Sequence, residues 1–140
     1  ILSRDDNFSL IKKKIPEKFH LILLDTVHEA KHVEKIFYHY YPLLKTGGLF
    51  IFDDISWLPY LKNKKRNNFN CEINNEEIFN KILEIKSEND DLIDLYFSFI
   101  GSGSAKIIKK EPDPLRKSKK LLTRKNSFKN IVRKIVYNFK

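Results

Sequence analysis

Two short apolar runs in the first half of the chain each stop abruptly at acidic residues. The first, Leu21-Ile22-Leu23-Leu24, is followed by Asp25, and the second, Leu49-Phe50-Ile51-Phe52, is followed by Asp53 and Asp54. Continuous apolar runs of this length are typical of strands buried on both faces, as in a parallel sheet covered by helices. The pattern therefore predicts two buried strands, each with carboxylates at its end.

A helical pattern connects the two predicted strands. Apolar residues recur at three- and four-residue spacing, which is typical of an amphipathic helix: Val33, Ile36, Phe37, Tyr40, Tyr41 and Leu44. Lys45-Thr46-Gly47-Gly48 then provides glycines for a turn that ends the helix. Strand, helix, turn and strand form a βαβ unit with a right-handed crossover. We therefore expect Asp25 and Asp53 at one edge of the sheet, where open α/β sheets bind ligands.

The remaining pattern predicts two further helices and a hairpin. Residues 8–15 have helical spacing, closed by Pro16. A second helix has an apolar stripe over residues 78–85, with Asn74 or Asn75 as its N-cap and its end within 87–91. Residues 92–100 and 104–108 are separated by Gly101-Ser102-Gly103, which favours an antiparallel β-hairpin.

Composition and charge divide the chain into two parts. Residues 1–105 carry 14 Lys or Arg and 16 Asp or Glu, whereas residues 106–140 carry 13 and 2. Pro112 and Pro114 mark the change, so we expect one α/β domain over residues 1–110 and a basic tail over 111–140. An apolar fraction of 41% suffices for a core. Because the chain contains no Met and opens on Ile1, we interpret it as a fragment of a longer polypeptide, with a processed amino terminus as the alternative.

The basic tail has its own apolar periodicity. Apolar residues fall on one helical face, with Lys and Arg on the others: Phe128, Ile131, Val132, Ile135, Val136 and Phe139. A basic amphipathic helix of this kind lies on an anionic membrane surface or docks on a protein, and packing on its own domain is the alternative. No nucleic-acid-binding motif is present, so we expect residues 115–140 to contact a membrane surface or a protein. The single cysteine, Cys71, fits a reducing compartment, and we expect a cytoplasmic protein that is free or peripheral to a membrane.

The motifs LLDTVH, PLLKTGG and LFIFDDI together resemble class I S-adenosylmethionine-dependent methyltransferases, most closely the small-molecule O-methyltransferase branch. The resemblance covers residues 1 to about 110 and matches the carboxyl-terminal half of that Rossmann-like fold, a parallel βαβ unit followed by an antiparallel hairpin. It implies methyl transfer to a hydroxyl of a sugar or another small acceptor. It also implies a site near the cofactor's adenine formed by Ser3, Asp5 and Asp6, for which a solvated turn is the alternative.

The resemblance also suggests roles at the strand ends. Asp25 and Asp53 or Asp54 match the metal-binding acids of the cation-dependent branch, and Mg²⁺ suits hard oxygen ligands of this kind. We expect Asp25 and Asp53 to be ligands, with Asp54 as either a third ligand or a structural cap. His28 is the candidate general base for the acceptor hydroxyl, with a polar surface histidine as the alternative. His32 and His39 on the helix are interpreted as structural.

The chain departs from the family in the cofactor site. The family's glycine-rich loop and the acidic residue that holds the ribose have no counterpart, since the glycines are at 47, 48, 101 and 103. We therefore expect no activity from the chain alone. A second hypothesis is a non-catalytic Rossmann-like remnant whose tail binds a membrane or partner. A hydrolase or another nucleotide-binding protein lacks support, because neither a nucleophile elbow nor a phosphate loop is present.

Overall fold

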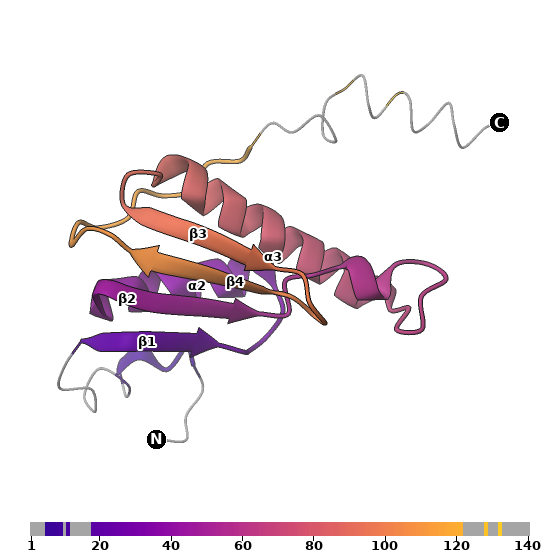
Figure 1. The fold of residues 1–140 in the computed structure, drawn as a ribbon, viewed down its shortest axis with the longest axis horizontal. Helices are drawn as coiled ribbons and strands as arrows, with labels where there is room; N and C mark the ends of the chain where they lie inside the picture. Colours follow the sequence, from indigo (N-terminus) through magenta and orange to yellow (C-terminus); the bar gives the residue numbers. More distant parts are fainter. Residues whose placement is uncertain (1–4, 10, 12–17, 122–127, 129–131, 133–140) are drawn as a thin grey trace.

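The computed structural model describes residues 5–9, 11, 18–121, 128 and 132, and within them four strands form one mixed sheet in the order β1-β2-β4-β3 (Figure 1). The strands are β1 (Phe19–Leu24), β2 (Leu44–Asp53), β3 (Ile93–Ser98) and β4 (Ser104–Lys109). β1 and β2 are parallel, whereas β4 is antiparallel to both β2 and β3. The predicted parallel pair and the predicted hairpin are therefore both confirmed.

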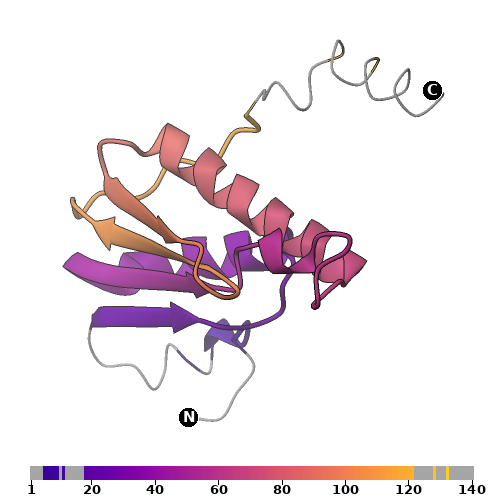
Figure 2. The same ribbon diagram turned by 45° about the vertical axis from the view of Figure 1, so that its right-hand side comes forward.

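Two helices, α2 (Ala30–Tyr40) and α3 (Phe69–Glu88), pack on the same face of the sheet (Figure 2). α2 is the predicted crossover helix, and it gives way to a 3₁₀ turn over Tyr41–Leu43. Pro42 has no backbone N–H with which to continue α-helical hydrogen bonding. The helix therefore ends there, and the chain enters β2 directly.

An aromatic core joins α2 to the central strand. The ring of Phe37 lies 4.9 Å from that of Phe50 and 5.2 Å from that of Phe52, centroid to centroid. All three rings are fully buried. The six apolar positions that predicted α2 and its continuation are buried as well. Burial of this apolar face holds the βαβ unit together, because each large side chain removed from water contributes about 1.5–3 kcal/mol.

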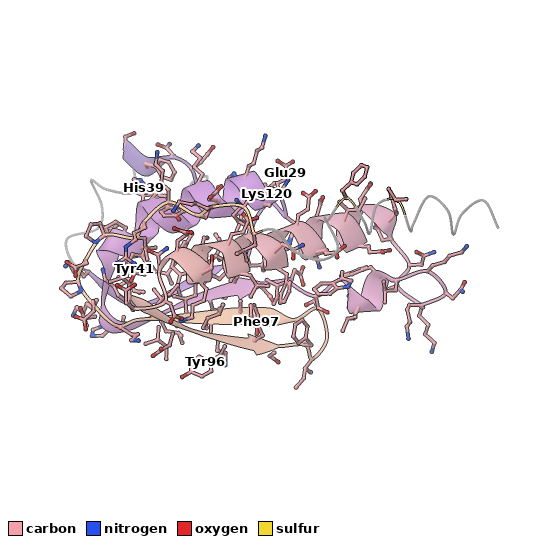
Figure 3. All side chains as sticks on the ribbon, turned by 90° about the horizontal axis from the view of Figure 1, so that it is seen from above. Glu29, His39, Tyr41, Tyr96, Phe97 and Lys120 are labelled. Atoms are coloured by element: carbon pink, nitrogen blue, oxygen red, sulfur yellow. The ribbon has the colours of Figure 1, made fainter. Side chains whose placement is uncertain are left out.

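The second face of the sheet differs from the prediction that both faces are buried. Side chains alternate between the two faces of a strand, so Tyr96 and Phe97 point to opposite sides of β3 (Figure 3). On the face away from the helices, Leu21 is 54% exposed, Leu23 62% and Tyr96 57%. Helices cover only one face among the described residues, so the continuous apolar run of β1 is half solvent-exposed.

The predicted glycine turn after α2 is instead part of a strand. β2 begins at Leu44, and its register with β1 shifts between Phe19, which pairs with Leu44, and Leu21, which pairs with Leu49. Gly47 has φ +76°, a backbone conformation that side chains disfavour. The two glycines therefore accommodate an irregularity inside the strand pair, and the turn prediction was wrong in its extent.

α3 begins earlier than predicted. Its N-cap is Asn68, whose Oδ1 accepts hydrogen bonds from the backbone N–H of Asn70 and of Cys71. Asn75, one of the two predicted caps, is buried within the helix and donates from Nδ2 to the Ser56 carbonyl oxygen at 2.9 Å. The first turns of α3 are polar, so hydrophobic spacing did not indicate them. The predicted end, within 87–91, is confirmed by the last helical residue, Glu88.

After β4 the chain runs back across the helices as a strap over residues 111–121. The buried side chain of Asn89 accepts from the Arg116 backbone N–H at 2.7 Å and donates to the Arg116 carbonyl oxygen at 3.1 Å. The hydroxyl of Tyr38 donates to the same carbonyl oxygen. The boundary placed at residue 110 stays a prediction. The predicted helix over residues 8–15 and the tail helix fall mostly outside the described residues, and within the described part of the chain no helix is long and apolar enough to cross a bilayer.

Candidate active site

The ends of β1 and β2 lie at the same edge of the sheet. Leu24 pairs with Phe52 in parallel register, so Asp25 and Asp53 follow at equivalent positions. Figure 1 shows that the β3–β4 turn and the loop after β2 are at this edge too. Asp25 is exposed, whereas Asp53 and Asp54 are half-buried. The three acids therefore lie at the edge of the sheet where they were predicted.

The backbone turns sharply after β2 at the paired acids. The Oδ1 of Asp53 accepts a hydrogen bond from the Asp54 backbone N–H at 2.9 Å. Asp54 has φ +55°, in the left-handed region that aspartate tolerates better than most residues because its short polar side chain can bond locally. This turn directs the Asp54 side chain away from the strand and toward the loop that follows β1.

His28 lies in that loop, between β1 and α2. Its Nε2 is 3.5 Å from Oδ2 of Asp54, and the two side chains are 34% and 33% exposed. A carboxylate beside an imidazole orients the ring. The pair is thus partly shielded but still open to solvent, and it can accept a proton from a hydroxyl placed beside it.

The loop after β2 is fixed by the β3–β4 turn. The backbone N–H of Ile55 donates to the Gly103 carbonyl oxygen at 3.3 Å, and that of Ser56 donates to the Ser102 carbonyl oxygen at 2.7 Å. Gly103 has φ +78°, and a Cβ at this position would lie 2.6 Å from the Cβ of Ser56. Only glycine fits this approach, and the loop that follows Asp54 depends on it.

Ser56 and Asn75 are supporting residues that sequence reasoning missed. Both are buried, and the hydrogen bond between them ties the loop after β2 to α3. Asn75 was interpreted as a helix cap because asparagine is common there. An asparagine on the buried stripe with Ile78 and Ile82 is the signal that could have indicated its role, since a buried amide needs partners.

The residues predicted to lie near the cofactor's adenine have different surroundings. The carboxylate of Asp5 accepts hydrogen bonds from the Thr26 hydroxyl and lies 2.8 Å from Nε2 of His32. Burial tends to raise the pKa of Asp5, but the hydrogen bonds from Thr26 and His32 and the charge of His32 outweigh it and lower that pKa below its ordinary value. Asp5 therefore fastens the start of the chain to the loop after β1, which agrees with the structural interpretation of His32.

The structure shows fewer contacts for the other two residues that were predicted to lie near the adenine. Asp6 Oδ2 lies 3.9 Å from Nζ of Lys35, and Ser3 is outside the described residues. The assignment of Ser3, Asp5 and Asp6 to a cofactor stays a prediction.

The strand-end edge is also the predicted site of a divalent metal. Carboxylate oxygens are the donors that Mg²⁺ prefers, and Asp25, Asp53 and Asp54 all lie at the strand-end edge. Across the described part of the chain, however, no three His, Cys, Asp or Glu side chains form a group that could hold a metal ion. Asp53 accepts from the backbone and Asp54 faces His28, so the three acids do not converge here.

Hollows near these residues are small or lie elsewhere. The one lined by His28, Thr26 and Asp53 has a volume of about 10 Å³, which holds at most a single water molecule. A larger groove of about 270 Å³ runs beside β1 and is lined by Asp5, Tyr40 and the strand's apolar side chains. β1 is at the edge of the sheet, so this groove follows the edge of β1 that faces away from β2.

Solved methyltransferases contain a similar arrangement of strands and helices. A Staphylococcus aureus protein assigned as a caffeoyl-CoA O-methyltransferase has a TM-score of 0.54 and 18% identity, over 77% of this chain and 49% of that chain. The MycE methyltransferase of the mycinamycin biosynthetic pathway, in complex with Mg, SAH and mycinamycin VI, has a TM-score of 0.52 and 18% identity, over 81% and 32%. An O-methyltransferase from Bacillus cereus in complex with SAH has a TM-score of 0.51 and 17% identity, over 75% and 46%.

At this level of sequence identity, these structural similarities establish the fold alone. Most of this chain matches part of the fold of small-molecule O-methyltransferases, and the chain spans about a third to a half of the length of those structures. No protein-family model matches the sequence, and no curated protein is similar to it in sequence. The resemblance noted in the sequence motifs is therefore confirmed at the level of the fold.

Proposed function

We propose that this chain forms the acceptor-side part of an S-adenosylmethionine-dependent O-methyltransferase that acts on a hydroxyl of a sugar or another small molecule. The observation that carries the proposal is the pair His28 and Asp54 at the edge where β1 and β2 end. Its support from outside the chain is that the fold is shared with O-methyltransferases, some of them in complex with SAH. The acceptor class rests on the family resemblance of the sequence motifs.

For methyl transfer, the protein has to align the acceptor hydroxyl with the methyl group and to remove the proton of that hydroxyl. When bound, S-adenosylmethionine supplies a methyl group on a positively charged sulfur, which leaves as a neutral thioether. His28 accepts the proton of the acceptor hydroxyl on Nδ1, because Nε2 faces Oδ2 of Asp54, which stabilises the imidazolium that forms. General-base catalysis of this kind contributes about 10²- to 10⁴-fold in rate. The turn at Asp54 and the approach of Gly103 to Ser56 hold the pair in place.

The residues of this chain do not fit a complete cofactor site. Its glycines are in the β2 irregularity and the β3–β4 turn, and none forms a loop between a strand and a following helix. Asp5 remains a candidate contact on the adenine side. We propose that the other cofactor contacts come from polypeptide outside this chain, and no step is assigned to Mg²⁺.

Calorimetry with S-adenosylhomocysteine tests this proposal. We compare the chain alone with the chain extended at its amino terminus by the coding sequence upstream of Ile1. The extended protein should bind and the chain alone should not, because only the former would complete the cofactor site. A failure of the extended protein to bind would contradict the proposal.

A non-catalytic Rossmann-like remnant is the second candidate. The observation that favours it is the hollow of about 10 Å³ beside His28, which holds no acceptor. In that case the extended protein would bind neither S-adenosylhomocysteine nor S-adenosylmethionine, and replacing His28 would have no functional effect.

A further inference from the structure

The loop that leads into α3 is strongly basic, and we call residues 61–68 the basic loop. Four cations lie within five of its residues: Lys62, Lys64, Lys65 and Arg66. Residues 55–71 contain no Asp or Glu, and residues 62–70 are all exposed. The positive charge of this part of the chain is therefore concentrated on one exposed segment.

None of the four cations forms an ion pair with an acidic residue in the described part of the chain. Exposed cations elsewhere do, since Arg116 lies 2.6 Å from Oδ1 of Asp91 and Lys119 lies 2.9 Å from Oε2 of Glu88. In the basic loop, the guanidinium of Arg66 instead lies over the ring of Tyr60, 5.6 Å from its centre. The domain thus leaves the charge of this loop without a neutralising acid among its described residues.

Large apolar side chains border the basic loop. Leu58, in the 3₁₀ turn η2 (Leu58–Tyr60), and Phe69, the first residue of α3, are 44% and 70% exposed. The β3–β4 turn adds Phe99 and Ile100, which are 44% and 89% exposed. Single exposed apolar residues are ordinary on a protein surface, whereas a group of them beside polar residues marks an interaction surface.

Contacts join the β3–β4 turn and the basic loop into one surface. The ring centre of Trp57, which precedes η2, lies 6.2 Å from that of Phe99. The contact between Arg66 and Tyr60 attaches the loop to η2. Figure 1 shows the loop before α3 and the β3–β4 turn projecting from the same end of the sheet. We call the basic loop together with its apolar neighbours the edge patch, those neighbours being Leu58, Phe69, Phe99 and Ile100.

The edge patch fits an extended anionic surface better than a small anion. None of its cations lines the hollow beside His28 or the groove along β1, so they do not converge on either cavity. A single-stranded nucleic acid is held by aromatic rings that stack on its bases, whereas Leu58 and Ile100 are aliphatic. Apolar side chains flanked by Lys and Arg are the combination that enters the boundary between lipid headgroups and acyl chains.

We propose that the edge patch binds an anionic lipid surface. Phe69 and Ile100, its most exposed apolar residues, enter the headgroup boundary, and the cations of the basic loop contact the headgroups. The edge at which β1 and β2 end then faces the membrane. The proposal is independent of methyl transfer, since it needs neither His28 nor a cofactor. It is also separate from the contact expected of residues 115–140, which stays a prediction.

Vesicle sedimentation with the full chain tests the proposal. Phosphatidylcholine vesicles with and without phosphatidylglycerol are compared at low and high salt, and binding should require the anionic lipid and weaken with salt. Lys64→Gln/Lys65→Gln should lower the partition constant about thirtyfold, because each cation near an anionic membrane contributes about 1 kcal/mol. The matched control, Lys110→Gln/Lys117→Gln, removes two exposed cations outside the patch and should bind almost as the unsubstituted chain does.

A second pair of variants tests the apolar contacts. Phe69→Ser/Ile100→Ser should lower the partition constant about tenfold or more, because both side chains leave water when the patch enters the headgroup boundary. Leu21→Ser/Leu23→Ser is the matched control. Its two side chains are 54% and 62% exposed on the open face of the sheet, so binding should be almost unchanged.

Three results would overturn the proposal. The first is equal binding to both vesicle types, and the second is a partition constant that Lys64→Gln/Lys65→Gln leaves unchanged or lowers no more than its control does. The third is the absence of sedimentation with the anionic vesicles. In that case, retarded migration of a poly(U) RNA by the same chain would indicate a nucleic-acid partner for the basic loop.

Discussion

The Nε2 of His28 lies 3.5 Å from the Oδ2 of Asp54, although the two residues belong to loops that follow different strands. Two features bring them together. The parallel register places the ends of β1 and β2 at one edge, and the left-handed backbone of Asp54 turns its side chain toward the neighbouring loop. The contact is therefore a property of the βαβ unit rather than of either loop alone.

Two substitutions test the left-handed backbone conformation of Asp54. Asp54→Gly should change the free energy of unfolding by less than about 1 kcal/mol, because glycine relieves the left-handed backbone and a partly exposed contact between a carboxylate and an imidazole contributes little. Asp54→Val should lower it by about 1–3 kcal/mol, since a β-branched residue is strained at this φ. Urea denaturation measures both, and equal stabilities would show that the backbone conformation is not as described.

The turn at Gly103 gives a second stability test. Gly103→Ala should lower the free energy of unfolding by about 2–4 kcal/mol, because the new Cβ would meet Ser56 at 2.6 Å on a backbone with φ +78°. Gly101→Ala is the matched control. It has φ +63° but nothing within 4 Å of a Cβ, so only backbone strain of about 1 kcal/mol is expected. A larger loss for Gly101→Ala would contradict the described packing.

The lowered pKa of Asp5 predicts that the free energy of unfolding depends on pH. Because this pKa is lower in the folded state than its ordinary value of 3.8, the carboxylate stabilises the fold above pH 3.8, and this contribution is lost as the pH falls through the folded-state pKa. Asp5→Asn should therefore reduce the free energy of unfolding at neutral pH by about 1–2 kcal/mol, with the difference shrinking in acid. Denaturation at several pH values measures it.

Asp6→Asn is the control for this prediction. The Asp6 carboxylate is 3.9 Å from the Nζ of the exposed Lys35, and such pairs contribute at most about 1 kcal/mol. A pH-independent effect of Asp5→Asn, or an equal effect in the control, would refute the role given to Thr26 and His32.

The strap depends on one buried amide. Asn89→Ala would remove both hydrogen bonds to Arg116 and the bond that Asn89 Nδ2 donates to the Ile85 carbonyl oxygen at 2.8 Å. We expect faster trypsin cleavage within residues 116–120. Asn80→Ala, at an exposed position of α3, should leave the cleavage rate unchanged. Equal cleavage rates in the two variants would show that Asn89 does not hold the strap.

Much of the fold could be predicted because burial leaves a clear pattern. The helical spacing from Val33 to Tyr41 and the abrupt ends of two apolar runs were sufficient to indicate parallel strands with acids at one edge. The glycines at 101 and 103 indicated the hairpin. These features depend on which side chains are buried on folding, and the spacing of apolar residues in the sequence indicates which ones these are.

Other features depend on contacts between distant residues, and spacing does not encode them. Asn75 was interpreted as a cap, because its bond to the Ser56 carbonyl oxygen exists only after α3 packs on the loop beyond β2. The Asp5 carboxylate has partners in Thr26 and His32, which a local interpretation of residues 1–6 could not indicate. Leu21 and Leu23 are exposed because no helix among the described residues covers their face of the sheet, whereas the apolar run itself suggested full burial.

The most direct measurement is the rate of methyl transfer from labelled S-adenosylmethionine by the chain extended upstream of Ile1. If His28 removes the acceptor proton, His28→Ala should lower this rate by about 10²- to 10⁴-fold while S-adenosylhomocysteine binding is retained. His39→Ala, which removes a ring stacked on Phe8, should leave it close to that of the unsubstituted protein. An unchanged rate in His28→Ala would contradict the assignment of His28 and Asp54 as the proton-accepting pair.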